Sequence, residues 1–240
     1  MGSRLLDCEP ALSGVAALYS PSTGIIDSHA YMLALQGEAE AYGCQIAFQT
    51  KARSWQPGPQ GGFAIKCGDD DTTIITCRKL IICGGLHASD FANAGPENSL
   101  VPATQYAKGN YFRLQTNAPF SHLIYPVPEP GGLGVHLTLD MNRQARFGPD
   151  VEWVDKIDYE VAPARSEKFY AAIRDYWPDL PDDSLVPDYS GIRPKLVGPS
   201  EPNADFKILQ STDHGIDGLT VLLGIESPGL TASLALAELV

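Results

Sequence analysis

The chain has 240 residues, of which 44% are hydrophobic, so it can bury the core of one large domain or two small ones. Its 29 acidic and 17 basic side chains give a formal net charge of −12, which disfavours nucleic acid and anionic membranes as partners because both require clustered Lys and Arg. The sequence has no integral membrane segment and no apolar signal-peptide region, and its five cysteines are irregularly spaced. These features predict a cytoplasmic protein with reduced thiols and without a metal site.

The first third of the chain predicts one helix followed by short strands. Asp27 or Ser28 can cap a helix over about residues 29–42, in which apolar residues recur at helical spacing. The stretches CQIAFQTKARSW, GGFAIKC and TTIITC then predict a meander of strands. The run KLIICGG is apolar up to Gly84 and Gly85, which predicts a strand buried on both faces, as in a parallel sheet. LHASDFANA reads as the helix after it.

The remainder of the chain is mostly strand-like. Between Gly109 and Asp150 the stretches YFRLQT, SHLIYPVP and GLGVHLTLDM predict strands. Ser166 can cap a second long helix, which Pro178 ends. The strands FKILQS and LTVLLG follow, joined by the turn-rich TDHGIDG, and a last helix is expected to begin near Gly229.

Two kinds of segment therefore interleave, which predicts a mixed α/β and α+β fold. Residues 20–50, 78–95 and 218–240 are expected to form α/β layers. Residues 51–77 and 100–215 are expected to form a mostly antiparallel sheet with one covering helix. A domain assembled from pieces that are separated in the sequence is the simplest account of this order.

The closing stretch GLTVLLGIESPGLTASLALAELV places glycine and proline between a buried strand and a helix. Such a junction presents free backbone N–H groups, and Gly229 allows a ligand to approach the backbone closely, so the site suits an anion or a cofactor. Gly84 and Gly85 stand at the end of a buried strand, where open α/β sheets place their ligands. In both places a plain turn with a packing glycine is the alternative interpretation.

Two further residues are candidates for chemistry. His136 alternates with Val135 and Leu137 on a predicted strand, so it would point away from the apolar residues and could accept a proton near neutral pH. Arg193, in YSGIRPKL, could grip a carboxylate through two parallel N–H bonds. A structural histidine and an internal salt bridge are the respective alternatives.

Taken in order, seven stretches resemble the FAD-dependent oxidoreductases of the D-amino-acid-oxidase type, and within them the L-2-hydroxyglutarate dehydrogenase-like branch. Any single stretch is weak, but seven in the family's order are a specific signal. They are EPALSGVAALYSPSTGIID (9–27), LIICGGLHA (80–88), YFRL (111–114), IYPVPEPGGLGVHLTLDMN (124–142), FGPD (147–150), DYSGIRPKL (188–196) and LLGIESPGLTASLALA (222–237).

The resemblance implies a partial FAD-binding α/β layer interleaved with an antiparallel-sheet substrate domain. It implies that His136 faces the flavin and accepts the hydroxyl proton of a 2-hydroxy acid, while Arg193 holds the carboxylate. Tyr189 and Lys195 are weaker candidates for contacting a second acid group. The cofactor-binding residues implied by the resemblance are Gly84, Gly85, Gly224, Ser227, Pro228, Gly229, Leu230 and Thr231.

The sequence departs from the family at its start, because the Gly-rich dinucleotide-binding segment that opens family members has no counterpart before Glu9. We therefore expect a truncated chain that alone binds FAD weakly or not at all, with an exposed sheet edge through which it would self-associate. The implied activity is hydride transfer from a small carboxylate substrate, a 2-hydroxy acid, to flavin. An amino-acid or amine oxidase of the same fold, and a non-catalytic chain or subunit that needs a partner, are the alternatives.

Overall fold

The computed structural model describes residues 7–68, 73–97, 100–128, 134–202 and 204–240. Helices and sheets are mixed, as the sequence predicts, and the chain forms two compact units whose segments interleave along the sequence. Unit 1 comprises residues 1–45, 108–152 and 158–191, and unit 2 comprises residues 46–107, 153–157 and 192–240.

A five-stranded sheet, most of whose residues belong to unit 1, has the order β6-β7-β5-β8 with β9 paired with β5. The strands are β5 (Gln105–Leu114), β6 (His136–Leu139), β7 (Ala145–Gly148), β8 (Glu152–Val154) and β9 (Leu185–Lys195). The β5–β7 and β6–β7 pairs are antiparallel. The stretch SHLIYPVP, expected as a strand, makes a single bridge from Ile124 to Leu137 instead.

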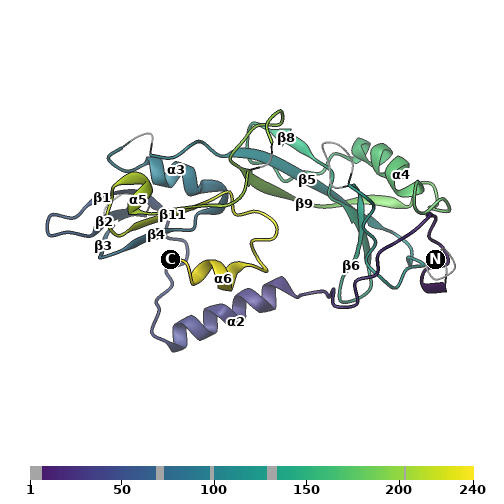
Figure 1. The fold of residues 1–240 in the computed structure, drawn as a ribbon, viewed down its shortest axis with the longest axis horizontal. Coiled ribbons are helices and arrows are strands. Elements are labelled where there is room, and N and C mark those ends of the chain that lie inside the picture. Colours follow the sequence, from purple (N-terminus) through teal and green to yellow (C-terminus); the bar gives the residue numbers. More distant parts are fainter. Residues whose placement is uncertain (1–6, 69–72, 98–99, 129–133, 203) are drawn as a thin grey trace. The chain divides into compact units, whose positions relative to one another are not determined.

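Helix α4 (Ser166–Arg174) builds the core of unit 1. Its Phe169 and Ile173 are fully buried, and the Phe169 ring packs 4.6 Å from that of Phe112 on β5. Helix α4 and strand β5 are both labelled in Figure 1. Ser166 was expected to cap this helix, but the expectation is wrong. The chain enters α4 through the 3-10 turn η2 (Pro163–Arg165), and no side chain caps it.

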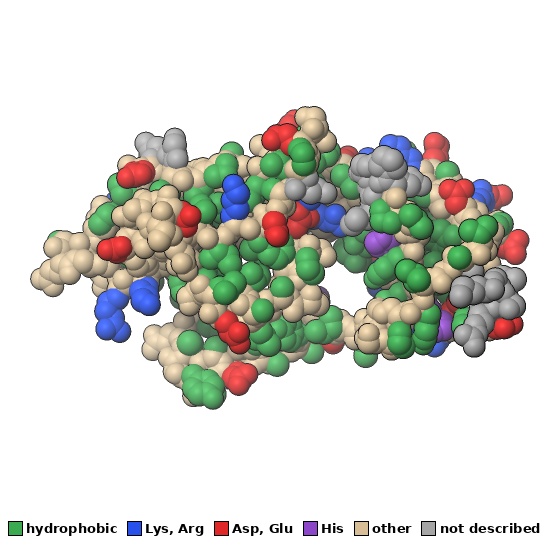
Figure 2. Space-filling model, in the orientation of Figure 1, with side chains coloured by type: hydrophobic (Ala, Val, Ile, Leu, Met, Phe, Trp, Pro, Cys, Tyr) green, Lys and Arg blue, Asp and Glu red, His purple; other side chains and the backbone are tan. Residues whose placement is uncertain are grey.

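Helix α2 (Ser28–Ala41) also belongs to unit 1, and its expected cap is confirmed. Asp27 Oδ1 accepts a hydrogen bond from the backbone N–H of Ala30 at 2.9 Å. None of the helix's residues is buried: Met32 is 50% exposed and Leu33 is 67% exposed. Hydrophobic side chains reach the visible surface at this helix (Figure 2).

Unit 2 contains two three-stranded sheets. The expected meander is confirmed as the antiparallel strands β1 (Ala52–Pro57), β2 (Phe63–Cys67) and β3 (Thr73–Cys77). The second sheet has the order β10-β11-β4, formed by β10 (Lys207–Leu209), β11 (Leu219–Leu223) and β4 (Leu80–Ile82). The meander packs on this second sheet, since Trp55 and Phe63 share a core with Leu219, Val221 and Leu223, whereas the sequence had grouped it with the antiparallel domain.

The β4–β11 pair is parallel, as KLIICGG predicts. However, β4 lies at the edge of its sheet and is buried on one face only, because Leu80 and Ile82 are covered while Ile81 is 45% exposed. A short 3-10 turn, η1 (Gly85–His87), and helix α3 (Ala88–Asn93) follow β4 as expected. The stretch TDHGIDG contains a single helical turn, α5 (Ser211–His214).

Candidate functional site

The loop after β11 is shaped by glycine at both ends. Gly224 has a φ of +67°, which favours glycine, and a Cβ there would lie 3.0 Å from the side chain of Leu196. Gly229 is buried, and a Cβ on it would meet the carbonyl oxygen of Glu226 at 2.6 Å. Glycine is therefore required at both positions for the loop to take this path.

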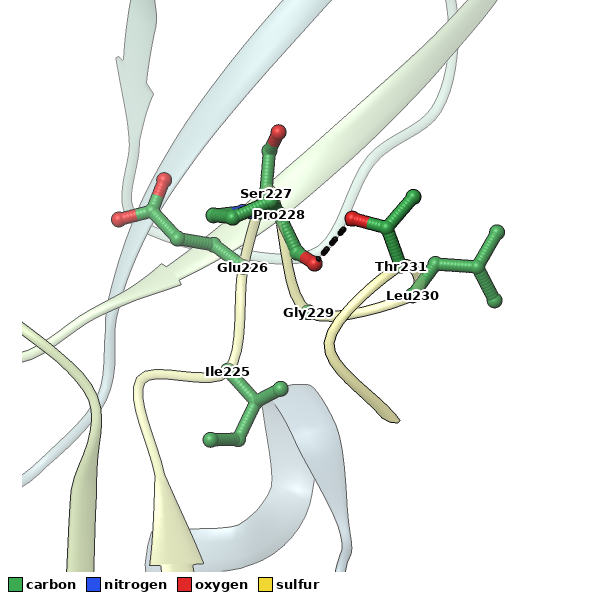
Figure 3. A pocket seen from close by; sticks show the side chains of 7 residues that line it. All are labelled: Ile225, Glu226, Ser227, Pro228, Gly229, Leu230 and Thr231. Atoms are coloured by element: carbon green, nitrogen blue, oxygen red, sulfur yellow. Dashed lines mark hydrogen bonds between the residues drawn. The ribbon is translucent and has the colours of Figure 1, made fainter. Parts of the chain in front are cut away.

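The loop surrounds a hollow of about 370 Å³ that is lined by residues 225–231 (Figure 3). Thr231 Oγ1 donates a hydrogen bond to the carbonyl oxygen of Pro228 at 2.9 Å. The backbone N–H groups of Leu230 and Thr231 donate to no partner in the hydrogen bonds described for the loop. The lining of the hollow thus includes two consecutive residues whose backbone N–H groups have no described partner, together with the apolar side chains of Ile225, Pro228 and Leu230.

The last helix begins later than the sequence suggests. Residues 227–232 form turns, and α6 extends over Ser233–Ala237, only five residues. A helix beginning near Gly229 is therefore wrong. The short α6 adds little dipole, so any stabilisation of an anion here must come mainly from the N–H groups of the turns.

Gly84 and Gly85 follow β4, and this loop follows β11. Because β4 and β11 are parallel, with Ile82 opposite Val221, both segments leave the sheet at the same end, where the two strands have their carboxyl termini. Gly84 leads into η1, and a Cβ on it would lie 2.9 Å from Ala88. The structure thus brings together the predicted cofactor-binding residues of both segments in unit 2.

Arg193 lies on β9 and belongs to an ion-pair cluster in unit 2. Its Nε lies 3.8 Å from Oε2 of Glu226, whose other oxygen, Oε1, lies 2.6 Å from Nζ of Lys195. All three side chains are largely buried, with exposed fractions of 24%, 12% and 13% for Arg193, Glu226 and Lys195. Glu226 lies inside the GIESPG motif, but no sequence pattern indicates which cations it pairs with.

His136 opens β6 in unit 1 and has the predicted orientation. Its neighbours Val135 and Leu137 are buried, at 8% and 0% exposure, so the half-buried imidazole projects from the opposite face of the strand. The ring of Tyr125 stacks on it, with 4.2 Å between ring centroids and 29° between ring planes. Sequence reasoning missed Tyr125, since a stacking partner from a separate segment leaves no local pattern.

Tyr189 lies on β9 in unit 1, stacked 4.5 Å from Tyr111 of β5. Partial burial raises the pKa of its phenol; Arg146 opposes this rise and Asp188 adds to it. Arg146 itself donates to Asp188 at 2.6 Å and to Asp140 at 2.8 Å. These paired charges hold β9 against β7 beside the tyrosine pair.

The described residues contain no group of three or more His, Cys, Asp or Glu side chains that could hold a metal ion. None of their helices combines the length and the apolar character needed to cross a membrane.

The family model of the FAD dependent oxidoreductases (DAO) matches residues 2–240. The chain belongs to this family. It is 40% identical to the mitochondrial L-2-hydroxyglutarate dehydrogenase of Arabidopsis thaliana, over 99% of this chain and 58% of that protein. It is 24% identical to the L-2-hydroxyglutarate dehydrogenase of Salmonella houtenae, over 89% of this chain and 59% of that protein.

Among solved structures, the reduced L-alpha-glycerophosphate oxidase of Mycoplasma pneumoniae with FAD bound has the same fold, with a TM-score of 0.79. The two chains are 19% identical, over 98% of this chain and 61% of that one. This DAO-family chain thus spans less than two thirds of the relatives it matches. The resemblance seen in the sequence is confirmed at the level of the family.

Proposed function

We propose that the chain carries the flavin-ring and substrate-binding parts of an FAD-dependent enzyme that oxidises a 2-hydroxy acid. The observation that carries the proposal is the 40% identity to an L-2-hydroxyglutarate dehydrogenase over 99% of the chain. The largely buried Arg193, beside the glycine-shaped loop that follows β11, supports it.

The residues present fit the flavin ring. The N–H groups of Leu230 and Thr231 are available to carbonyl oxygens of the ring, and the bare backbone at Gly229 permits close approach. Gly84 and Gly85 would border the cofactor from the neighbouring strand, with Ser227 and Pro228 lining the loop. When bound, FAD would supply the hydride acceptor.

The protein's own groups would bind and orient the substrate and move its proton. Arg193 would hold the carboxylate next to the hydroxyl-bearing carbon. His136 would accept the hydroxyl proton at an imidazole nitrogen, with the Tyr125 ring fixing the imidazole plane. Tyr189 would contact a second acid group, whereas Lys195 would have to share its ammonium with Glu226 to do so.

A flavin spectrum and a substrate screen test this proposal. The purified chain, mixed with FAD, is assayed with an artificial electron acceptor against 2-hydroxy acids and, in parallel, amino acids. Because the chain alone is expected to bind FAD weakly, the cofactor is added in large excess, and oxidation of 2-hydroxy acids is then the expected result. Oxidation of amino acids alone would favour the amino-acid oxidase alternative, and absence of both a flavin spectrum and turnover would favour a chain that requires a partner.

The two proposed roles predict different kinetic losses. His136→Asn should lower kcat by about 10²–10⁴-fold, the usual contribution of a general base, with little change in KM.

Arg193→Lys keeps the charge but loses one of the two parallel hydrogen bonds to the carboxylate, so kcat/KM should fall by at least about 30-fold, the lower end for a broken charged hydrogen-bond pair. A variant that retains kcat/KM for 2-hydroxy acids would contradict the role of the residue it replaces.

A further inference from the structure

The ion-pair cluster beside the hollow has an uneven arrangement. Glu226 contacts Lys195 at 2.6 Å, within salt-bridge and hydrogen-bond distance, but approaches Arg193 only to 3.8 Å. Arg193 and Lys195 are two residues apart on β9, so they project from the same face of the strand. Both cations therefore face one carboxylate, which lies closer to the ammonium group of Lys195 than to the guanidinium group of Arg193.

The loop geometry fixes this arrangement. The backbone N–H of Glu226 donates to Gly224 at 2.9 Å, and its carbonyl oxygen accepts from Gly229. In Figure 3 the carboxylate of Glu226 and the side chain of Leu230 point to opposite sides of the loop. The carboxylate is thus held by the same turn that forms the hollow, on the side of the β9 cations.

The charges of the three side chains add to one positive charge. Arg193 and Lys195 contribute two, and Glu226 removes one. Each of the three side chains is about three-quarters or more buried, so interactions between their charges are stronger than at the surface. The net charge of the cluster therefore decides which anions the site accepts.

We propose that Glu226 is a positioning and specificity-determining residue that pairs mainly with Lys195 and leaves Arg193 as the less compensated cation of the cluster, so that the cluster accepts a single carboxylate. The inference rests on the proposed function in one respect, the assignment of Arg193 as the carboxylate ligand. It adds the prediction that the balance between Glu226 and Lys195 sets how strongly that ligand attracts an anion.

Charge-removing variants separate this role from simple structural support. Glu226→Gln leaves two cations, Lys195→Met leaves one cation and one carboxylate, and the double variant restores a single positive charge. The double variant also removes a buried pair together, which proteins tolerate better than removal of one partner. It therefore remains informative even if a single variant folds poorly.

The probe is lactate, a 2-hydroxy acid with one carboxylate, titrated at constant ionic strength against chloride. Binding is followed by the NMR signal of the Arg193 Nε–H group, assigned through Arg193→Lys. This readout is independent of turnover and of electron transfer, so it does not depend on the oxidase activity proposed above.

We expect Glu226→Gln to bind lactate at least about 10-fold more tightly and Lys195→Met at least about 10-fold more weakly, because one unit charge about 4 Å away changes affinity by roughly 10³-fold at an effective dielectric constant near 20 and by roughly fivefold in bulk water. The double variant should return to within about threefold of the original chain. Matched controls are Glu238→Gln and Lys207→Met, which make the same charge changes at exposed positions of unit 2 and should leave affinity unchanged.

Equal affinities in all variants, or weaker binding in both single variants, would overturn the inference and leave Glu226 as a purely structural partner. A different result would overturn the carboxylate role itself: Arg193→Lys binding lactate as well as the original chain, measured by backbone amide shifts of residues 224–231. The two failures are therefore distinguishable.

Discussion

The two longer helices of unit 1 are held in different ways. Helix α4 covers a sheet with fully buried Phe169 and Ile173, whereas α2 is longer, 14 residues against nine, and buries none of its side chains. Two local contacts support α2: the Asp27 cap and the Gln36–Glu40 hydrogen bond of 2.9 Å. The comparison shows that helical spacing of apolar residues predicts a helix but does not reveal what the apolar residues contact.

The largest expected effect tests the packing of α4. Phe169→Ala should lower the free energy of unfolding by about 3–5 kcal/mol, the usual cost of removing a buried aromatic ring, because its cavity in the unit 1 core would remain unfilled. Urea denaturation measures the change. Leu33→Ala on α2 is the counterpart and should cost less than about 0.5 kcal/mol. A cost similar to that of Phe169→Ala would mean that the outer face of α2 is covered in solution.

An intermediate effect on the free energy of unfolding is expected from Glu9, whose hydrogen bonds join the segment before α2 to Ser121 and His122 in unit 1. Glu9 is 4% exposed, and its carboxylate accepts from Ser121 N–H at 2.8 Å, Ser121 Oγ at 2.7 Å and His122 N–H at 2.8 Å. Burial alone would raise the pKa of Glu9, but hydrogen bonds from these two residues outweigh it, and its pKa is lowered. Glu9→Gln should cost about 2–3 kcal/mol near neutral pH, as lost hydrogen bonds to a charged group imply.

The sign of the pH dependence follows from that direction. A lowered folded-state pKa stabilises the fold above the unfolded-state pKa, and this stability is lost as the pH falls through the folded-state value. The stability difference between the original chain and Glu9→Gln should therefore shrink towards acidic pH. Glu167→Gln, at an exposed position of α4, is the control. A difference that grows on acidification would contradict the lowered pKa.

The smallest effect concerns the local stability of α2. A Cβ at Gly37 would meet no atom within 4 Å, so Gly37→Ala should stabilise the helix by about 0.5–1 kcal/mol. Because none of the residues of α2 is fully buried, the helix should open independently of the core. Amide hydrogen exchange should therefore slow in residues 28–41 while the urea midpoint hardly changes. Slower exchange throughout unit 1 would show that α2 and α4 unfold together.

Elements with strong local patterns could be predicted from the sequence. The helix after Asp27, the meander of residues 52–77 and the parallel pair β4–β11 follow from capping, alternation and apolar runs. Boundaries set by tertiary contacts could not be predicted. The start of α4 depends on the 3-10 turn before Ser166, and the exposure of Ile81 depends on which strands flank β4.

The residues of the candidate site likewise fall into those that a local pattern predicts and those that depend on tertiary contacts. The glycines of the β11 loop and the strand positions of His136 and Arg193 were visible as motifs. Partners from other segments were not: Tyr125 stacks on His136, and Glu226 pairs with Lys195, across separations that no local period encodes. The GIESPG motif contained Glu226, yet its cations come from β9.

The placement of the tryptophans gives each unit its own optical probe. Trp177 is 5% exposed in unit 1, where its ring lies 5.3 Å from Phe120. Trp55 is 3% exposed in unit 2, and its indole N–H donates to the carbonyl oxygens of Phe91 and Ala92. Replacement of Trp153, which is 37% exposed, together with either Trp55 or Trp177 would give single-tryptophan chains that emit from one unit at a time. Fluorescence could then record whether the two interleaved units melt in one transition or in two.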